Sequence, residues 1–228
     1  PMKLYNSQNV CQVFDRLPYE KIYFIGDSLT RNQFFALLTI LGIPKSNNNN
    51  NNKYSSRYLP PACYSNSTSC CLGFQKIWLP KADCAAKYFS QEINFCNHKN
   101  LTIEYHWFDS SSFWSISRII KAASSKDLFF FNIGAHFSYR YRIMMDKYLL
   151  KIFENFKKSN DNDNDNKKLI WLHQYLPNEY FKPYPYRTKS QNYEIADQFY
   201  NQMEGFIIEN NDIYNIEILD YRKLGENV

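Results

Sequence analysis

Residues Ile22–Gln33 read IYFIGDSLTRNQ, and this stretch decides the fold. An apolar run comes first, which predicts a buried strand over Lys21–Ile25. Gly-Asp-Ser follows, and then apolar residues recur at helical spacing, which predicts a helix over Thr30–Leu41. Gly42 and Pro44 are expected to end that helix. The chain is therefore expected to open its folded part with a strand, a tight turn and an amphipathic helix.

The same alternation returns after residue 100. Apolar runs predict strands, and amphipathic runs predict the helices between them. The expected strands are Leu101–Phe108, Leu128–Gly134, Leu169–Tyr175 and Ile213–Asp220, and the expected helices are Phe113–Ala123, Arg142–Lys158 and Tyr193–Glu209. Together with the first pair, this makes five strands and four helices, which predicts an α/β fold with a mainly parallel sheet between helices. The 228 residues suit a single domain of this kind.

Residues 43–100 lack a long regular pattern and carry most of the cysteines, so we expect a disulfide-rich insertion there. The even number of cysteines favours three disulfides, whose pairing stays open. Zinc binding is the alternative, but the cysteines form no C-x-x-C pair. Glycosylation sequons at Asn66 and Asn100 lie in the same region and, with the cysteines, favour an oxidising, secretory compartment. The cysteines are Cys11, Cys63, Cys70, Cys71, Cys84 and Cys96.

Charge and hydropathy argue against two classes of partner. The formal net charge is +5, but the positive residues are scattered, so no nucleic-acid partner is expected. No apolar run approaches the roughly 18 residues needed to cross a bilayer, so no membrane span is expected in this chain. The first residues, PMKLYNSQ, do not form a signal peptide. Any targeting or anchoring segment is expected outside the chain as given.

Ser28 lies between the first expected strand and the first expected helix. In parallel sheets, ligands bind beyond the carboxyl ends of the strands. A helix N-terminus supplies unpaired N–H groups and the positive end of the helix dipole. Both favour the negative charge that develops during acyl transfer, so we interpret Ser28 as a nucleophile. The alternative is that Ser28 or Thr30 only caps the helix.

The segment GDSLTRNQ, preceded by KIYFI, resembles the first signature block of the plant trichome-birefringence-like proteins and of the wider PC-esterase group in the SGNH superfamily. Cys11-Gln-Val-Phe is similar to the segment that leads into that block. Asn132-Ile-Gly-Ala-His-Phe is similar to the family's N-x-G-H-W-W, with the histidine one place later. Residues Trp171–Phe181 resemble the family's R-T-x-S-P-x-H-F in outline, although His173 and Glu179 stand where arginine and histidine are expected.

The resemblance implies a flavodoxin-like SGNH-hydrolase fold, with the activity of an O-acetyltransferase or esterase on a polysaccharide or glycan in the Golgi lumen or outside the cell. By this analogy Ser28 carries the acyl group from an acyl donor to a sugar hydroxyl or to water. No cofactor and no metal is expected. Two alternatives stay open. One is a catalytically silent protein that binds glycans or packs in an extracellular assembly, and the other is an SGNH lipase or thioesterase.

Several residues near the expected turn and strand ends are given supporting roles by the residue pattern and the resemblance. The N–H of Ser28 is expected to be one oxyanion donor, and Gly134 or Asn132 another. Asp27 is expected to hold the turn by accepting bonds from backbone N–H groups. Arg31 lies one helical turn beyond Ser28 and is a candidate for substrate contact, with a solvated surface arginine as the alternative.

The four histidines are expected to differ in role. His136 follows the third expected strand, so it should lie on the same rim of the sheet as Ser28 and contact substrate. His98 lies in the insertion and is expected to be exposed. His106 and His173 lie within strands, where packed and hydrogen-bonded histidines are the expectation.

The general base of the resembled family lies in an Asp-x-x-His pair after the final strand. No such pair occurs in these 228 residues, and the last expected strand is followed by Tyr221–Val228. Residues Ile218–Leu224 resemble the family's sequence just before that pair. We therefore expect the catalytic loop and a closing helix beyond Val228, with a naturally truncated, inactive product as the alternative. The chain as given should show little or no esterase activity.

Overall fold

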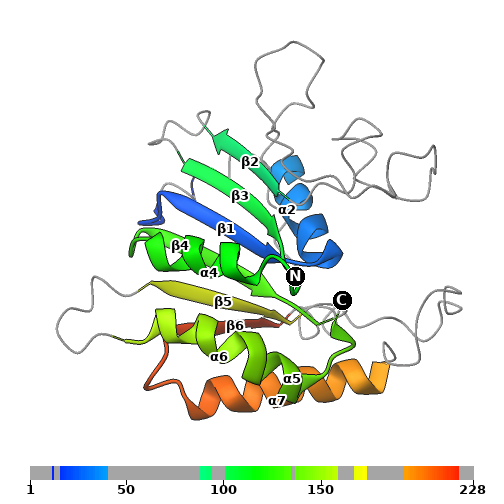
Figure 1. The fold of residues 1–228 in the computed structure, drawn as a ribbon. Coiled ribbons are helices and arrows are strands. Elements are labelled where there is room, and N and C mark those ends of the chain that lie inside the picture. The colour runs from blue at the N-terminus through cyan, green and yellow to red at the C-terminus, as the bar shows by residue number, and fades with distance from the viewer. Residues whose placement is uncertain are drawn as a thin grey trace, which may run out of the picture. The chain divides into compact units, whose positions relative to one another are not determined.

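The computed structural model of the chain describes residues 12, 16–40, 88–93, 101–134, 137–158, 167–173 and 193–220. The fold has two compact units, Pro1–Trp107 and Phe108–Val228. Figure 1 shows the elements of both along the chain. The second unit alternates strands with helices along the chain.

The first unit contains strands β1 (Lys21–Gly26), β2 (Tyr88–Ile93) and β3 (Leu101–Trp107), with helix α2 (Ser28–Ile40) directly after β1. The strand order is β2-β3-β1. Strands β1 and β3 are parallel, and β2 is antiparallel to β3. Helix α2 follows β1 directly, so the turn before α2 lies at the carboxyl end of β1.

Helix α2 packs its apolar side on β1 and β3. Phe34 lies with its ring centroid 5.9 Å from that of Phe24 in β1 and 6.0 Å from that of Tyr105 in β3. Residues Ile22–Gly26 are all buried, as expected for a strand covered on both faces. This packing anchors both sides of the turn at Asp27 and Ser28.

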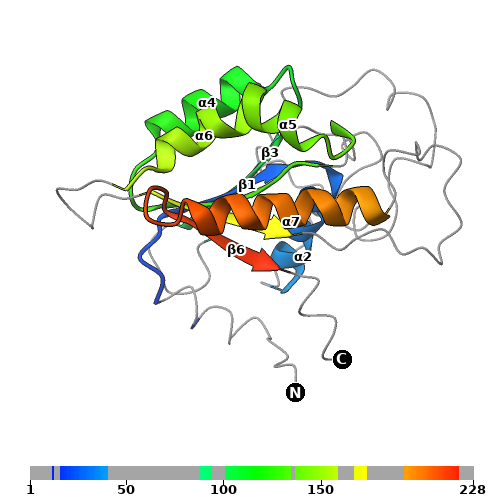
Figure 2. The same ribbon diagram turned by 90° about the horizontal axis from the view of Figure 1, so that it is seen from below.

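The second unit contains the strands β4 (Asp127–Asn132), β5 (Lys168–His173) and β6 (Ile216–Asp220), which lie in the order β4-β5-β6. All neighbouring pairs among them are parallel. The helical segments are α4 (Phe113–Ala122), α5 (Tyr141–Met144), the π-helical η3 (Met145–Leu149), α6 (Leu150–Phe153), the 3₁₀ turn η4 (Glu154–Phe156) and α7 (Tyr193–Glu209). Helices α4, α5 and α6 lie on one face of these strands, and α7 lies beside α5 (Figure 2).

Aromatic rings fill the core of the second unit. The Trp171 ring of β5 stacks on Phe131 of β4 at 5.9 Å and meets Phe153 of α6 edge-on at 6.2 Å. Phe199 of α7 lies 6.3 Å from the same Trp171 ring. Each large aromatic ring buries a large apolar area, so a few aromatic side chains hold the helices against the strands.

The sequence-based fold is largely confirmed. All five expected strands and three of the four expected helices are present, with ends within three residues of those expected, and the α/β class with mainly parallel strands holds. The helix expected over Arg142–Lys158 is instead a run of four short segments, α5, η3, α6 and η4. The region 43–100 is more regular than expected, because Tyr88–Ile93 forms β2. The sequence YFSQEI has no strong apolar pattern, and the segment forms a strand by pairing with β3. The rest of the expected insertion lies outside the described residues, and so do all six cysteines.

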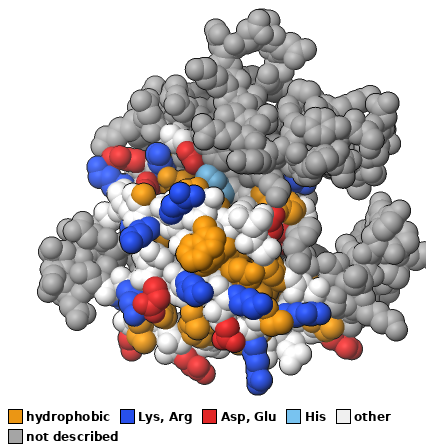
Figure 3. Space-filling model, in the orientation of Figure 1, with side chains coloured by type: hydrophobic (Ala, Val, Ile, Leu, Met, Phe, Trp, Pro, Cys, Tyr) orange, Lys and Arg blue, Asp and Glu red, His pale blue; other side chains and the backbone are white. Residues whose placement is uncertain are grey.

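Two surface features bear on possible partners. Within the part of the chain that the structure describes, no helix is long and apolar enough to cross a membrane. On the face shown in Figure 3, Lys and Arg side chains are interspersed with Asp, Glu and apolar side chains and form no single basic stripe.

Candidate functional site

The turn between β1 and α2 is held by Asp27. Its Oδ1 accepts a hydrogen bond from the Leu29 N–H at 2.9 Å, and its backbone carbonyl accepts one from the Arg31 N–H at 3.0 Å. These two bonds make Asp27 the N-cap of α2. The side chain is 1% exposed, so it lies under the turn. This is the turn-holding role that the sequence predicted for Asp27.

Ser28 is the first residue of α2 and is half-buried. Because Asp27 supplies the cap, the alternative in which Ser28 caps the helix is wrong. Within the described residues, the Ser28 hydroxyl has no hydrogen-bond partner. A serine hydroxyl beside the N–H groups of a helix N-terminus is positioned to attack a carbonyl whose oxygen then becomes negative.

Tyr105 supports the same turn, a role that was not predicted from the sequence. Its hydroxyl donates toward the carbonyls of Gly26 and Asp27, at 3.3 and 3.2 Å. Burial raises the pKa of the phenol well above its ordinary value of 10.0, while the charge of Arg31 lowers it and that of Asp27 raises it. The available signal was its inward position in β3, where Leu101, Ile103 and Tyr105 alternate as buried residues.

Arg31 is not a solvated surface residue. It is 8% exposed, and its guanidinium carbon lies 5.7 Å from the centre of the Trp107 ring. A cation over an indole face is stabilised by the ring quadrupole, more so when both are shielded from water. The side chain is therefore held within the first unit, one helical turn from Ser28.

In the second unit, three polar side chains stand at the carboxyl ends of neighbouring parallel strands. Asn132 is the last residue of β4, His173 the last of β5 and Asp220 the last of β6. The Asn132 amide nitrogen donates to the carbonyl of Leu172 and approaches the Tyr200 hydroxyl at 3.5 Å. Its buried Oδ1 has no hydrogen-bond partner among the described residues. The side chain thus offers an acceptor rather than the oxyanion donor that was expected.

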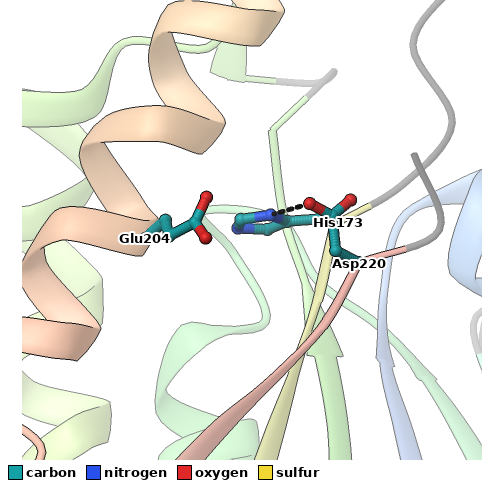
Figure 4. A group of neighbouring side chains, drawn as sticks. All are labelled: His173, Glu204 and Asp220. Carbon is teal, nitrogen blue, oxygen red and sulfur yellow. Dashed lines mark ion pairs between the residues drawn. The ribbon is translucent and has the colours of Figure 1, made fainter. Parts of the chain in front are cut away.

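His173 is the centre of the second group of polar residues. It is fully buried, and its Nδ1 lies 3.5 Å from Asp220 Oδ2. The Tyr200 ring of α7 packs against the imidazole at 5.0 Å. Glu204, one helical turn after Tyr200, points its carboxylate toward the same imidazole (Figure 4). The donor atoms of His173, Glu204 and Asp220 all lie within 4.8 Å of one another.

His173 was expected to be a packed strand residue, and neither Glu204 nor Asp220 was singled out from the sequence. The packed environment is confirmed by the burial and by the Tyr200 contact. The available signal was Asp220, which ends the last expected strand, where functional side chains gather; His173 ends β5 two residues before the end expected from the sequence. His106 is likewise packed as expected, with its Nε2 at 2.9 Å from Glu104 Oε2.

Packing requires glycine at position 134, which the sequence did not reveal. A Cβ at this position would lie 2.7 Å from Cε1 and 2.9 Å from Cδ1 of Tyr139. The backbone carbonyl of Gly134 also accepts bonds from the N–H groups of Phe137 and Tyr139, both at 3.0 Å. The ring of Tyr139 therefore closes over Gly134 and leaves no room for a side chain.

The remaining candidates lie outside the described residues. These are His136, the glycosylation candidates Asn66 and Asn100, and all six cysteines. Among the described candidates, Asp27, Ser28 and Arg31 gather at one turn of the first unit, and Asn132 and Gly134 belong to the second unit. No protein-family model, curated protein or solved structure matches this chain.

Proposed function

We propose that this protein is a serine-dependent O-acyltransferase or esterase of the PC-esterase type, with an SGNH fold, that acts on a glycan through an acyl-enzyme on Ser28. The observation that carries the proposal is that residues other than Ser28 hold the turn between β1 and α2. Asp27 caps α2 and Tyr105 holds the carbonyls beneath it, so the Ser28 hydroxyl is not consumed in building the structure.

The proposed chemistry is a two-step transfer. The Ser28 oxygen attacks the carbonyl carbon of an acyl donor, and its proton goes to a general base. The tetrahedral oxyanion is stabilised by the Ser28 N–H and the helix dipole, and the donor's leaving group then departs. In the second step a sugar hydroxyl or water gives its proton to the base and attacks the acyl carbon. The ester bond to Ser28 then breaks, and the Ser28 oxygen takes a proton back. A second oxyanion donor, which the resemblance assigns to Gly134 or Asn132, stays a prediction.

The general base follows from the resemblance alone. We place it in an Asp-x-x-His pair that these 228 residues do not contain. The 228-residue chain should accordingly turn over esters slowly or not at all, because an unassisted serine is a weak nucleophile at neutral pH. An Asp-x-x-His pair encoded shortly after Val228 would support the proposal, whereas robust Ser28-dependent turnover by the chain as given would show that the base lies elsewhere, with His173 among the first residues to test.

The experiment is active-site labelling of the protein in its native full-length form. A fluorophosphonate probe should modify the peptide that contains Ser28, and Ser28→Ala should abolish both labelling and ester turnover. Ser112 is a matched control, because it also stands at a helix N-terminus but its hydroxyl exchanges hydrogen bonds with the backbone of Asp109. Labelling should be absent from Ser112 and unchanged by Ser112→Ala.

The outcomes separate the alternatives. An unlabelled Ser28 in a well-folded full-length protein would contradict the enzyme proposal and favour a silent glycan-binding protein. If Ser28 is labelled, turnover of acetylated sugars is the expected result. Turnover confined to long-chain esters or thioesters would instead identify an SGNH lipase or thioesterase.

A further inference from the structure

The carboxyl ends of β5 and β6 bring together side chains that the proposed acyl transfer does not use. From their geometry we propose that His173, Glu204 and Asp220 form a binding site for a divalent cation of the zinc type. One imidazole and two carboxylates are ligands that zinc and its first-row neighbours accept. This inference is independent of the function proposed for Ser28, which lies in the other unit.

The three ligands come from three elements of one unit. His173 and Asp220 are direct partners in the parallel β5–β6 register, so the sheet fixes their relative position. Glu204 approaches from α7, and Figure 4 shows its carboxylate turned toward the imidazole. The donor atoms lie within 4.8 Å of one another. Glu204 is half-buried and has a long side chain, so it can close the remaining distance by a rotamer change.

The His173–Asp220 ion pair also has the spacing of two ligands that share a metal ion. Charge-assisted N–H···O bonds are about 2.7–2.9 Å long, whereas Nδ1 and Oδ2 here are 3.5 Å apart. Two ligands at about 2.1 Å from a zinc ion and at tetrahedral angles lie about 3.4 Å from each other. The observed spacing is therefore close to that of two adjacent zinc ligands.

The charge and the surroundings support the same assignment. Two carboxylates that face one buried imidazole attract a divalent cation. Tyr200 packs its ring on the imidazole and its hydroxyl lies 3.5 Å from the Asn132 amide. The Tyr200 ring contact restricts the rotation of the His173 imidazole.

The test is Zn²⁺ binding by the 228-residue chain after chelator treatment, with free thiols alkylated so that cysteines do not contribute. Equilibrium dialysis should find one tightly bound Zn²⁺ for the unmodified chain. Glu204→Gln and Asp220→Asn should each weaken it by more than the roughly 10–100-fold seen when only outer contacts are lost. Glu194→Gln is the matched control, since Glu194 is an exposed carboxylate on the same helix. It should bind as the unmodified chain does.

Two further readouts do not depend on dialysis. Zn²⁺ should raise the melting temperature of the chain and of Glu194→Gln, but not of the ligand variants, because a ligand of the native state stabilises it by mass action. Co²⁺ should give the absorption of a nitrogen and oxygen site without a thiolate band. The proposal is overturned if no Zn²⁺ binds, if Glu204→Gln binds it equally well, or if the thiolate band appears. Because Glu204 is half-buried, its variant keeps the test decisive even where a His173→Gln variant fails to fold.

Discussion

Gly134 shows how a single missing side chain can be a packing requirement. Gly134→Ala would place a methyl group 2.7 Å from the ring of Tyr139, which is itself held against Phe199 at 5.7 Å between ring centroids. We expect the variant to lose about 1–3 kcal/mol of unfolding free energy, as overpacked cores do. Urea denaturation of the chain measures this directly.

Gly205 provides the matched control. It lies in α7, and a Cβ there would meet nothing within 4 Å. Gly205→Ala should therefore stabilise the chain by about 0.5–1 kcal/mol, because alanine costs less backbone entropy in a helix. We therefore expect the two substitutions to change the unfolding free energy in opposite directions. A stabilising Gly134→Ala would mean that Tyr139 moves aside freely.

Tyr105 gives a pH-dependent prediction. Its phenol would ionise near pH 10.0 in the unfolded chain, and burial raises the pKa well above that value in the folded state. The folded state thus keeps a proton that the unfolded state loses. The associated stability is complete below pH 10 and is lost as the pH rises above it.

In Tyr105→Phe, the unfolding free energy should fall less steeply as the pH rises above 10. At neutral pH it should cost about 1 kcal/mol, because the carbonyls of Gly26 and Asp27 lose their donor. The same replacement at the half-buried Tyr148 controls for removing a tyrosine hydroxyl elsewhere. Denaturation curves at a series of alkaline pH values decide the matter, and an unchanged slope in Tyr105→Phe would contradict the assignment.

At the scale of elements, the side chain of Asp27 caps helix α2. Asp27→Ala removes the bond to the Leu29 N–H and should cost about 0.5–2 kcal/mol of unfolding free energy. Asp27→Asn keeps a capping oxygen and should retain most of that stability. Thermal or urea unfolding distinguishes the two variants. Equal losses in both would show that the charge of Asp27, rather than its cap, stabilises the turn.

At the scale of the whole molecule, the main prediction concerns the redox state of the six cysteines. We expect them to be paired in protein recovered from an oxidising compartment, because their number is even and sequons lie among them. Mass spectrometry of unreduced protein after alkylation should find no free thiol. Loss of one bridge should cost about 2–4 kcal/mol. Six alkylatable thiols in secreted material would contradict both the pairing and the proposed compartment.

The amino-acid sequence by itself determined the order and type of most elements. The periodicity of apolar residues is a local property, so the pattern of side chains was enough to locate the strand at Lys21–Gly26 and the helix at Tyr193–Glu209. The position of Ser28 at the start of a helix and the turn-holding role of Asp27 followed from the same local pattern. β2 was missed because its strand character comes from a partner rather than from its own residues.

The tertiary structure decided which distant residues meet. His173 and Asp220 are paired by the register of β5 on β6, Glu204 reaches them from α7, and Tyr105 lies under a turn more than seventy residues earlier in the chain. No local sequence pattern predicts these contacts, because they depend on how the strands align and on which side chains are buried by packing. A histidine that looks like core in its own strand thus becomes a candidate ligand once the neighbouring strand and helix are in place.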